Sequence, residues 1–124
     1  MKIKTSDLSG DALNFAVATA QGVKVNVGFR NLTYVPQGKR TLYRFDPVTN
    51  WKQGGPIIER AGISLNLTTM TGDWAWSATC NPSEARQCGE YGPTMLTAGL
   101  RCVVAATLGD EVDVPRELVP EAVS

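Results

Sequence analysis

The stretch DALNFAVATAQGVKVNVGFR, residues 11–30, contains the change of hydrophobic period that decides the fold class. In its first half, apolar residues recur at the spacing of one helical face, at Leu13, Ala16, Val17 and Ala20. Gly22 follows, and glycine favours the left-handed conformation that ends many helices. Beyond it, apolar and polar residues alternate as in a half-buried strand. The stretch therefore predicts a helix at 9–21 and a strand at 23–30.

Both periods recur along the rest of the chain. Alternating segments predict further strands at 41–45, 63–70 and 74–79, the last two joined by a tight turn. A second apolar helical face predicts a helix at 93–108, opened by a proline and stopped by a glycine. We expect an α+β fold in which one small, mainly antiparallel sheet packs against these two helices.

The remaining segments are expected to be irregular or short. Turn residues predict loops at 31–41 and 80–92, a long loop or single helical turn at 46–56, and a short helix from Pro56 to residue 61. A single globular domain is expected over residues 1–114, with an extended or mobile acidic tail at 115–124. Large aromatic residues in strands usually belong to the core, and we expect this of Trp74, Trp76, Tyr43 and Tyr91.

The composition excludes several classes of protein. The chain has 124 residues, of which 43% are hydrophobic, enough for one domain with its own core. No segment approaches the ~20 apolar residues of a membrane-spanning helix, so no membrane partner is expected. Residues 1–7 are polar and lack the apolar run of a secretory signal, so we expect a cytoplasmic protein.

Cysteine and histidine counts restrict the chemistry. The three cysteines, Cys80, Cys88 and Cys102, cannot all pair, and the chain has no histidine. Zinc sites that need histidine and Ser-His-Asp or Cys-His catalysis are therefore excluded within one chain. Three thiolates with Glu84 or Glu90 would match no known ligand spacing, so we expect no metal and no cofactor, with reduced, structural cysteines.

Charge is balanced overall but unevenly distributed along the sequence. Residues 1–60 hold nine Lys and Arg against four acids, whereas residues 61–124 hold three against eight. Such polarity attracts an anionic ligand to one face, unless the two halves interleave in the fold. Because the formal net charge is zero, a large nucleic-acid footprint is not expected.

Residues 50–60 are the first candidate for a binding site. We expect Gln53, Gly54 and Gly55 to expose backbone N–H groups next to a helix start, where anions bind. Trp51 would stack on a base or a ribose, and Arg60 and Arg44 would make bidentate contacts to phosphate oxygens. The alternative interpretation is purely structural, with the glycine pair as a tight turn and the indole in the core.

Arg101 is a separate candidate. It lies in the predicted second helix among apolar neighbours, where an unpaired guanidinium is costly. We therefore expect a carbonyl or carboxylate partner, with Glu59 and Asp73 as candidates, in a structural clamp or in the floor of a site.

Several segments resemble the NinX-like family of small phage and prophage proteins, which has no assigned activity. The resemblance is carried by residues 1–8 with 12–18, by 50–60, and by 92–96 running into 101–105 and 109–115. At Phe15 the family pattern often has tryptophan, a difference that concerns packing. The resemblance implies a phage accessory protein that acts in the cytoplasm of the infected bacterium.

Three functions remain open at this stage. The favoured one is a non-catalytic binding protein that captures a small anionic, nucleotide-type ligand, as a counter-defence against bacterial immunity. The alternative is a module that docks on a host or phage protein through aromatic and charged residues. A carboxylate- or metal-dependent hydrolase is the third. A homo-oligomer is expected, because the edge of a small sheet often pairs with a second copy.

Overall fold

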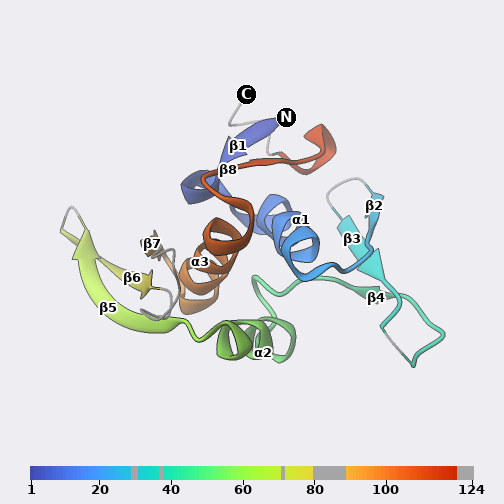
Figure 1. Cartoon of the computed structure of the whole chain (residues 1–124), viewed down its shortest axis with the longest axis horizontal. Helices are drawn as coiled ribbons and strands as arrows, with labels where there is room; N and C mark the ends of the chain where they lie inside the picture. Colours follow the sequence, from blue (N-terminus) through green and yellow to red (C-terminus); the bar gives the residue numbers. More distant parts are fainter. Residues whose placement is uncertain (29–30, 37, 71, 80–88, 120–124) are drawn as a thin grey trace.

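The computed structural model describes residues 1–28, 31–36, 38–70, 72–79 and 89–119 (Figure 1). Within these ranges the helices are α1 (Gly10–Gln21), α2 (Trp51–Ala61) and α3 (Met95–Leu108), with short 3-10 helices η1 (Thr5–Asp7) and η2 (Arg116–Leu118). The strands are β1 (Lys2–Lys4), β2 (Asn26–Gly28), β3 (Asn31–Tyr34), β4 (Tyr43–Arg44), β5 (Ser64–Met70), β6 (Asp73–Thr79), β7 (Gly89–Gly92) and β8 (Glu111–Asp113). The α+β class predicted from the sequence is confirmed.

The described strands form three small antiparallel sheets, so the prediction of one sheet is wrong. β1 pairs with β8, β2–β3–β4 form a second sheet, and β5–β6–β7 form a third. Figure 1 shows the second and third sheets on opposite sides of α3. Alternation of apolar residues identifies a strand but not its partner, and therefore does not distinguish one sheet from three.

The elements with the strongest sequence patterns lie where they were predicted. α1 ends at Gly22, which adopts the left-handed conformation with φ 71°. The β5–β6 hairpin pairs in register from Ser64 opposite Thr79 to Met70 opposite Asp73. α3 begins two residues later than predicted, because the Thr94 hydroxyl caps it by accepting the Thr97 N–H at 3.1 Å.

α3 is the central element of the core. Its side chains are buried along nearly the whole helix, including Leu96, Leu100, Val103 and Val104. Figure 1 shows α1 and α2 against one side of α3 and the β5–β6–β7 sheet against the other. A helix that is apolar all round has to be covered on several sides, and α1, α2 and the β5–β6–β7 sheet cover α3. Among the described residues, none of the helices has the length and apolar character needed to cross a bilayer.

The sequence patterns did not predict several of the short strands. β1, β3, β7 and β8 have three or four residues each, too few to show a convincing alternation. The β1–β8 pair joins the two ends of the described chain, and Ile3 lies opposite Val112. Leu118 and Val119 are buried in the main core, so the chain packs on the domain beyond the boundary predicted at residue 114. Residues 120–124 of the expected tail lie outside the described residues.

The expected core positions of three aromatic side chains are wrong. Trp74 is 72% exposed, Tyr91 49% and Tyr43 46%, whereas Trp76 is partly buried against Ala78. The far end of the β5–β6 hairpin projects away from α3 in Figure 1, and Trp74 belongs to this end of β6, next to the start of the strand at Asp73.

Candidate functional site

The segment expected to form a glycine turn is a helix. Asn50 caps α2 by accepting the Lys52 N–H on its side chain at 3.0 Å. The Gln53 and Gly54 N–H groups donate to the Asn50 carbonyl oxygen at 3.0 and 2.8 Å. The prediction of exposed backbone donors at these two residues is therefore wrong, because the helix begins at Trp51 and already uses them.

Gly54 has a packing role. The residue is buried, and a Cβ atom built on it would lie 2.3 Å from the Pro47 carbonyl oxygen and 2.7 Å from Leu96 Cδ2. Glycine thus lets α2 approach both α3 and the chain that leads into α2. Gly55, by contrast, is only partly buried, and a Cβ atom built on it would meet only Trp51 Cε3, at an ordinary contact distance of 3.5 Å.

Gln53 is a structural clamp between α2 and β4. Its side-chain oxygen accepts the Asp46 N–H at 2.6 Å, and its side-chain nitrogen donates to the Arg44 carbonyl oxygen at 2.8 Å. Both polar atoms of the side-chain amide already have backbone partners. Gln53 therefore holds the wall of a site in position more than it contacts a ligand itself.

A polar network fixes the chain that leads into α2. Burial raises the pKa of the Asp46 carboxyl, but hydrogen bonds from Thr49 and Asn14, together with the positive charge of Arg44, bring it below its ordinary value of 3.8. The Arg44 guanidinium lies 3.9 Å from the carboxylates of both Asp46 and Asp11. Its charge is therefore partly compensated by two acids.

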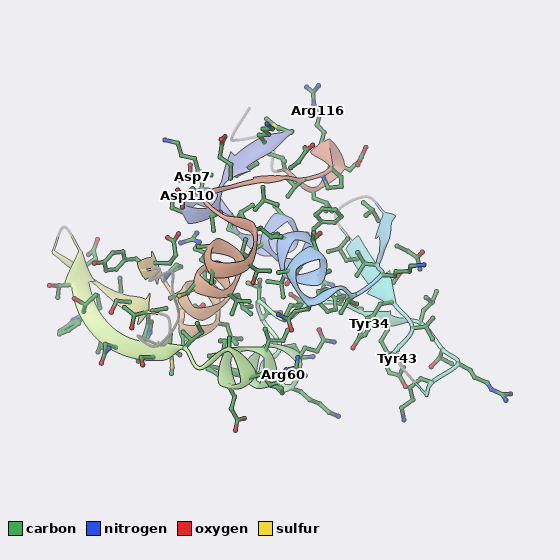
Figure 2. All side chains as sticks on the ribbon, in the orientation of Figure 1. Asp7, Tyr34, Tyr43, Arg60, Asp110 and Arg116 are labelled. Carbon is green, nitrogen blue, oxygen red and sulfur yellow. The ribbon has the colours of Figure 1, made fainter. Side chains whose placement is uncertain are left out.

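A groove lies between α2 and the β3–β4 strands, and we call it the α2 groove. It has a volume of about 580 Å³, within the range of roughly 300–1,000 Å³ typical of small-ligand sites. Three cations line it, Lys39, Lys52 and Arg60, with the rings of Tyr34 and Tyr43. No carboxylate occurs among the described lining residues. Figure 2 shows Arg60, Tyr34 and Tyr43 on the same side of the molecule.

The aromatic floor of the α2 groove is rigid. The Tyr34 and Phe45 rings meet edge to face, with centroids 5.2 Å apart and an interplanar angle of 80°. Phe45 is buried, and its N–H donates to the Leu32 carbonyl oxygen at 2.8 Å. Tyr34 is thereby held against the core, while Tyr43, opposite it in the sheet, stays exposed.

The structure places only two of the seven site residues predicted from the sequence in the lining of the α2 groove. Gln53 and Arg60 line the α2 groove, where Arg60 also donates to Gln21 Oε1 at 3.3 Å. Trp51 is 53% exposed at the start of α2, so it is not a core residue, but it does not line the groove. The groove lining also omits Arg44 and both glycines.

The sequence prediction missed the two lysines and the two tyrosines of the groove, Lys39, Lys52, Tyr34 and Tyr43. Lys39 belongs to a basic pair in a predicted loop, and Lys52 stands inside the segment that was already singled out. The sequence offered no means of bringing the 34–43 hairpin to α2, because that contact is made in the tertiary structure.

Arg101 is remote from the α2 groove and acts as a clamp. Its Nε donates to the Leu8 carbonyl oxygen at 2.8 Å, and its Nη1 donates to the Tyr91 carbonyl oxygen at 2.7 Å. The expectation of a carbonyl partner is confirmed, whereas Glu59 and Asp73 are not its hydrogen-bond partners. Burial lowers the pKa of the guanidinium, against the opposing effect of Glu90 and Asp7.

Metal ligands and thiols add no further site in the described part of the chain. No three Cys, Asp or Glu side chains within it are grouped as a metal ion would require. Cys102 is buried on α3 next to Ala78 and Ala98. Cys80, Cys88 and Glu84 lie outside the described residues.

Fold and groove together define a small α+β protein with one strongly cationic, aromatic groove among its described surfaces. A family model described as "Bacteriophage P22, NinX" matches residues 4–107. Since this match spans most of the 124 residues, the chain belongs to the bacteriophage P22 NinX family. A comparison with curated proteins finds no match.

Proposed function

We propose that this phage-family protein binds a small anionic ligand of nucleotide type in the α2 groove, without converting it chemically. The observation that carries the proposal is the charge of the lining, where Lys39, Lys52 and Arg60 stand together without a carboxylate. Three cations on one concave surface favour a ligand with more than one negative charge.

The side chains of the groove suit the two parts of a nucleotide. Arg60 offers a planar guanidinium for bidentate contacts to phosphate oxygens, and the two lysines add point charges. Tyr43 is exposed and free to stack on a base, beside Tyr34, which the core holds in place. Base stacking and phosphate contacts together would fill a groove of about 580 Å³.

We propose a particular use for such binding in a protein of a phage family. A phage protein that captures a nucleotide-type signal lowers the free concentration of that signal in the infected cell. Capture requires affinity and no catalytic group, which agrees with a chain that has no histidine. We therefore propose a counter-defence role as a ligand sponge.

Thermal unfolding in the presence of a nucleotide panel tests the proposal. The panel contains purine and pyrimidine mono-, di- and triphosphates, cyclic dinucleotides and inorganic pyrophosphate. A ligand present at 100 times its dissociation constant adds about 2.7 kcal/mol of stability, which raises Tm by roughly 10 °C in a domain of this size. If no member of the panel raises Tm, the proposal is wrong.

A matched pair of variants locates the binding. Arg60→Ala is expected to weaken binding of the active nucleotide roughly 10- to 100-fold, the loss of a hydrogen bond to a charged group. Arg116→Ala removes the same charge from η2, far from the groove in Figure 2, and is expected to leave affinity unchanged. Equal affinities of the two variants would place the ligand elsewhere.

A further inference from the structure

A second depression lies on the other side of α3, next to β6 and β7. We call it the Trp74 depression; it has a volume of about 370 Å³, and its lining includes Asp73, Trp74, Glu90, Tyr91 and Arg101. It shares no residue with the α2 groove. Its chemistry also differs, because two carboxylates, Asp73 and Glu90, line it, whereas the described lining of the α2 groove has three cations and no carboxylate.

The exposed rings indicate a contact surface. Trp74 is 72% exposed, the largest exposed fraction among the large hydrophobic residues of the described chain, and Tyr91 beside it in the lining is 49% exposed. Exposed tryptophan and tyrosine are the residues that most often dominate the binding energy of protein interfaces. An indole face also attracts a cation, and a guanidinium more often than an ammonium.

Arg101, the one cation among the described residues that line the depression, is already committed to the fold. Two of the Arg101 N–H groups donate hydrogen bonds to the carbonyl oxygens of Leu8 and Tyr91, at 2.8 and 2.7 Å. These bonds hold the guanidinium between the start of α1 and β7. Arg101 therefore positions the wall of the depression with two of its five N–H groups.

In the part of the lining that the structure describes, carboxylates outnumber this cation. Asp73 and Glu90 line the depression, and Asp7 and Asp110 lie close enough to act on Arg101 and on Glu90. Figure 2 shows Asp7 and Asp110 next to one another, and the Thr5 N–H of η1 donates to the Asp110 carbonyl oxygen at 2.7 Å. Burial raises the pKa of Glu90, and the Asp110 charge adds to the rise while Arg101 opposes it. A cation that binds beside Glu90 would reduce the free-energy cost of keeping this partly buried carboxylate ionised.

We infer that the Trp74 depression docks an arginine side chain of a partner protein. The guanidinium would lie on the Trp74 indole and pair with the carboxylates of Glu90 and Asp73, which a planar fork of donors suits. The negative excess repels phosphate, so a nucleic acid or a nucleotide is not the occupant. This surface would bring a partner to the molecule independently of any ligand in the α2 groove.

NMR of the indole N–H groups tests the inference on the full chain. The chain has three tryptophans, and Trp74→Phe assigns the signal of residue 74. The probe is the blocked tripeptide acetyl-Gly-Arg-Gly-amide, and its control has citrulline, the uncharged isostere, in place of arginine. We expect the arginine peptide to shift the Trp74 signal saturably at millimolar concentration, with no shift of the Trp51 signal.

Charge variants complete the test. Glu90→Gln and Asp73→Asn are each expected to raise the dissociation constant of the arginine peptide roughly two- to fivefold, and Glu117→Gln in η2 is expected to leave it unchanged. Asp73 is exposed at the hairpin end, so its variant remains informative if Glu90→Gln does not fold. An equal shift with citrulline overturns the inference, and so does a Trp74 shift produced by raising the protein concentration alone, which would indicate a second copy.

Discussion

Asn14 and Asp46 join α1 to the chain that leads into α2, through a hydrogen bond of 2.9 Å from Asn14 Nδ2 to Asp46 Oδ1. Asn14 is 1% exposed, and its Oδ1 accepts the Val48 N–H at 3.0 Å. Asp46 in turn donates its backbone N–H to Gln53. One buried amide therefore sets the position of the helix that forms a wall of the α2 groove.

Asn14→Ala tests this link. The substitution leaves the Val48 N–H without its partner inside the protein and removes a bond to Asp46, so we expect a loss of about 2–3 kcal/mol in the free energy of unfolding. Urea-induced unfolding measures the loss. Asn66→Ala, at an exposed position in β5, is the control and is expected to change stability by less than ~0.5 kcal/mol. Similar losses in both variants would contradict the role of Asn14.

The two neighbouring glycines of α2 are expected to respond differently to alanine. Gly54→Ala places a Cβ atom 2.3 Å from the Pro47 carbonyl oxygen, so α2 must shift and we expect a loss of more than ~2 kcal/mol. At Gly55 the gain of up to ~1 kcal/mol in helix propensity is opposed by the following Pro56, which disfavours the helical conformation of a residue with a Cβ. We expect Gly55→Ala to stay within ~1 kcal/mol of the native chain. Thermal unfolding compares them, and a Gly54→Ala variant as stable as Gly55→Ala would disprove the close approach.

The lowered pKa of Asp46 predicts that the protein loses stability in acid. Because the pKa of this carboxyl is lower in the folded chain than its ordinary value of 3.8, ionised Asp46 stabilises the fold above that value. This stabilisation is lost as the pH falls through the lowered pKa. Asp46→Asn should therefore be less stable than the native chain at pH 7, and the difference in stability should shrink as the pH falls below 3.8. Unfolding by urea at several pH values measures this difference, and Glu117→Gln is the control for loss of one carboxylate. A difference in stability that does not change with pH would contradict a stabilising role of the ionised Asp46 carboxylate.

Arg101→Met tests the clamp between Leu8 and β7. Methionine keeps much of the length of the side chain but donates to neither carbonyl oxygen, so we expect a loss of about 1–2 kcal/mol and faster hydrogen exchange in β7. Arg116→Met changes an exposed arginine in η2 in the same way and is expected to have little effect. Unchanged hydrogen exchange in β7 would mean that the two hydrogen bonds of Arg101 do not stabilise this strand.

Local patterns predicted the elements that are long enough to show a period. The helical face from Leu13 to Ala20 indicated α1, and the alternation on both sides of residues 71–73 indicated the β5–β6 hairpin. The Asn50–Arg60 segment was recognised as distinctive, but its glycines were interpreted as a turn. Helix propensity alone opposes a Gly-Gly-Pro run, and the α2 helix forms because Ile57 and Ile58 bury against the core while Asn50 caps its start.

By itself, the sequence determined the α+β class, α1, the hairpin, the absence of histidine chemistry and the family. Only the tertiary structure decided that the strands form three sheets, that Arg101 faces a different depression from Arg60, and that Lys39 and Tyr43 meet α2. The reason is physical. Periodicity reports which face of an element is apolar over a few residues, whereas pairing and grooves depend on which distant segments meet across the core, and many arrangements bury the same apolar faces.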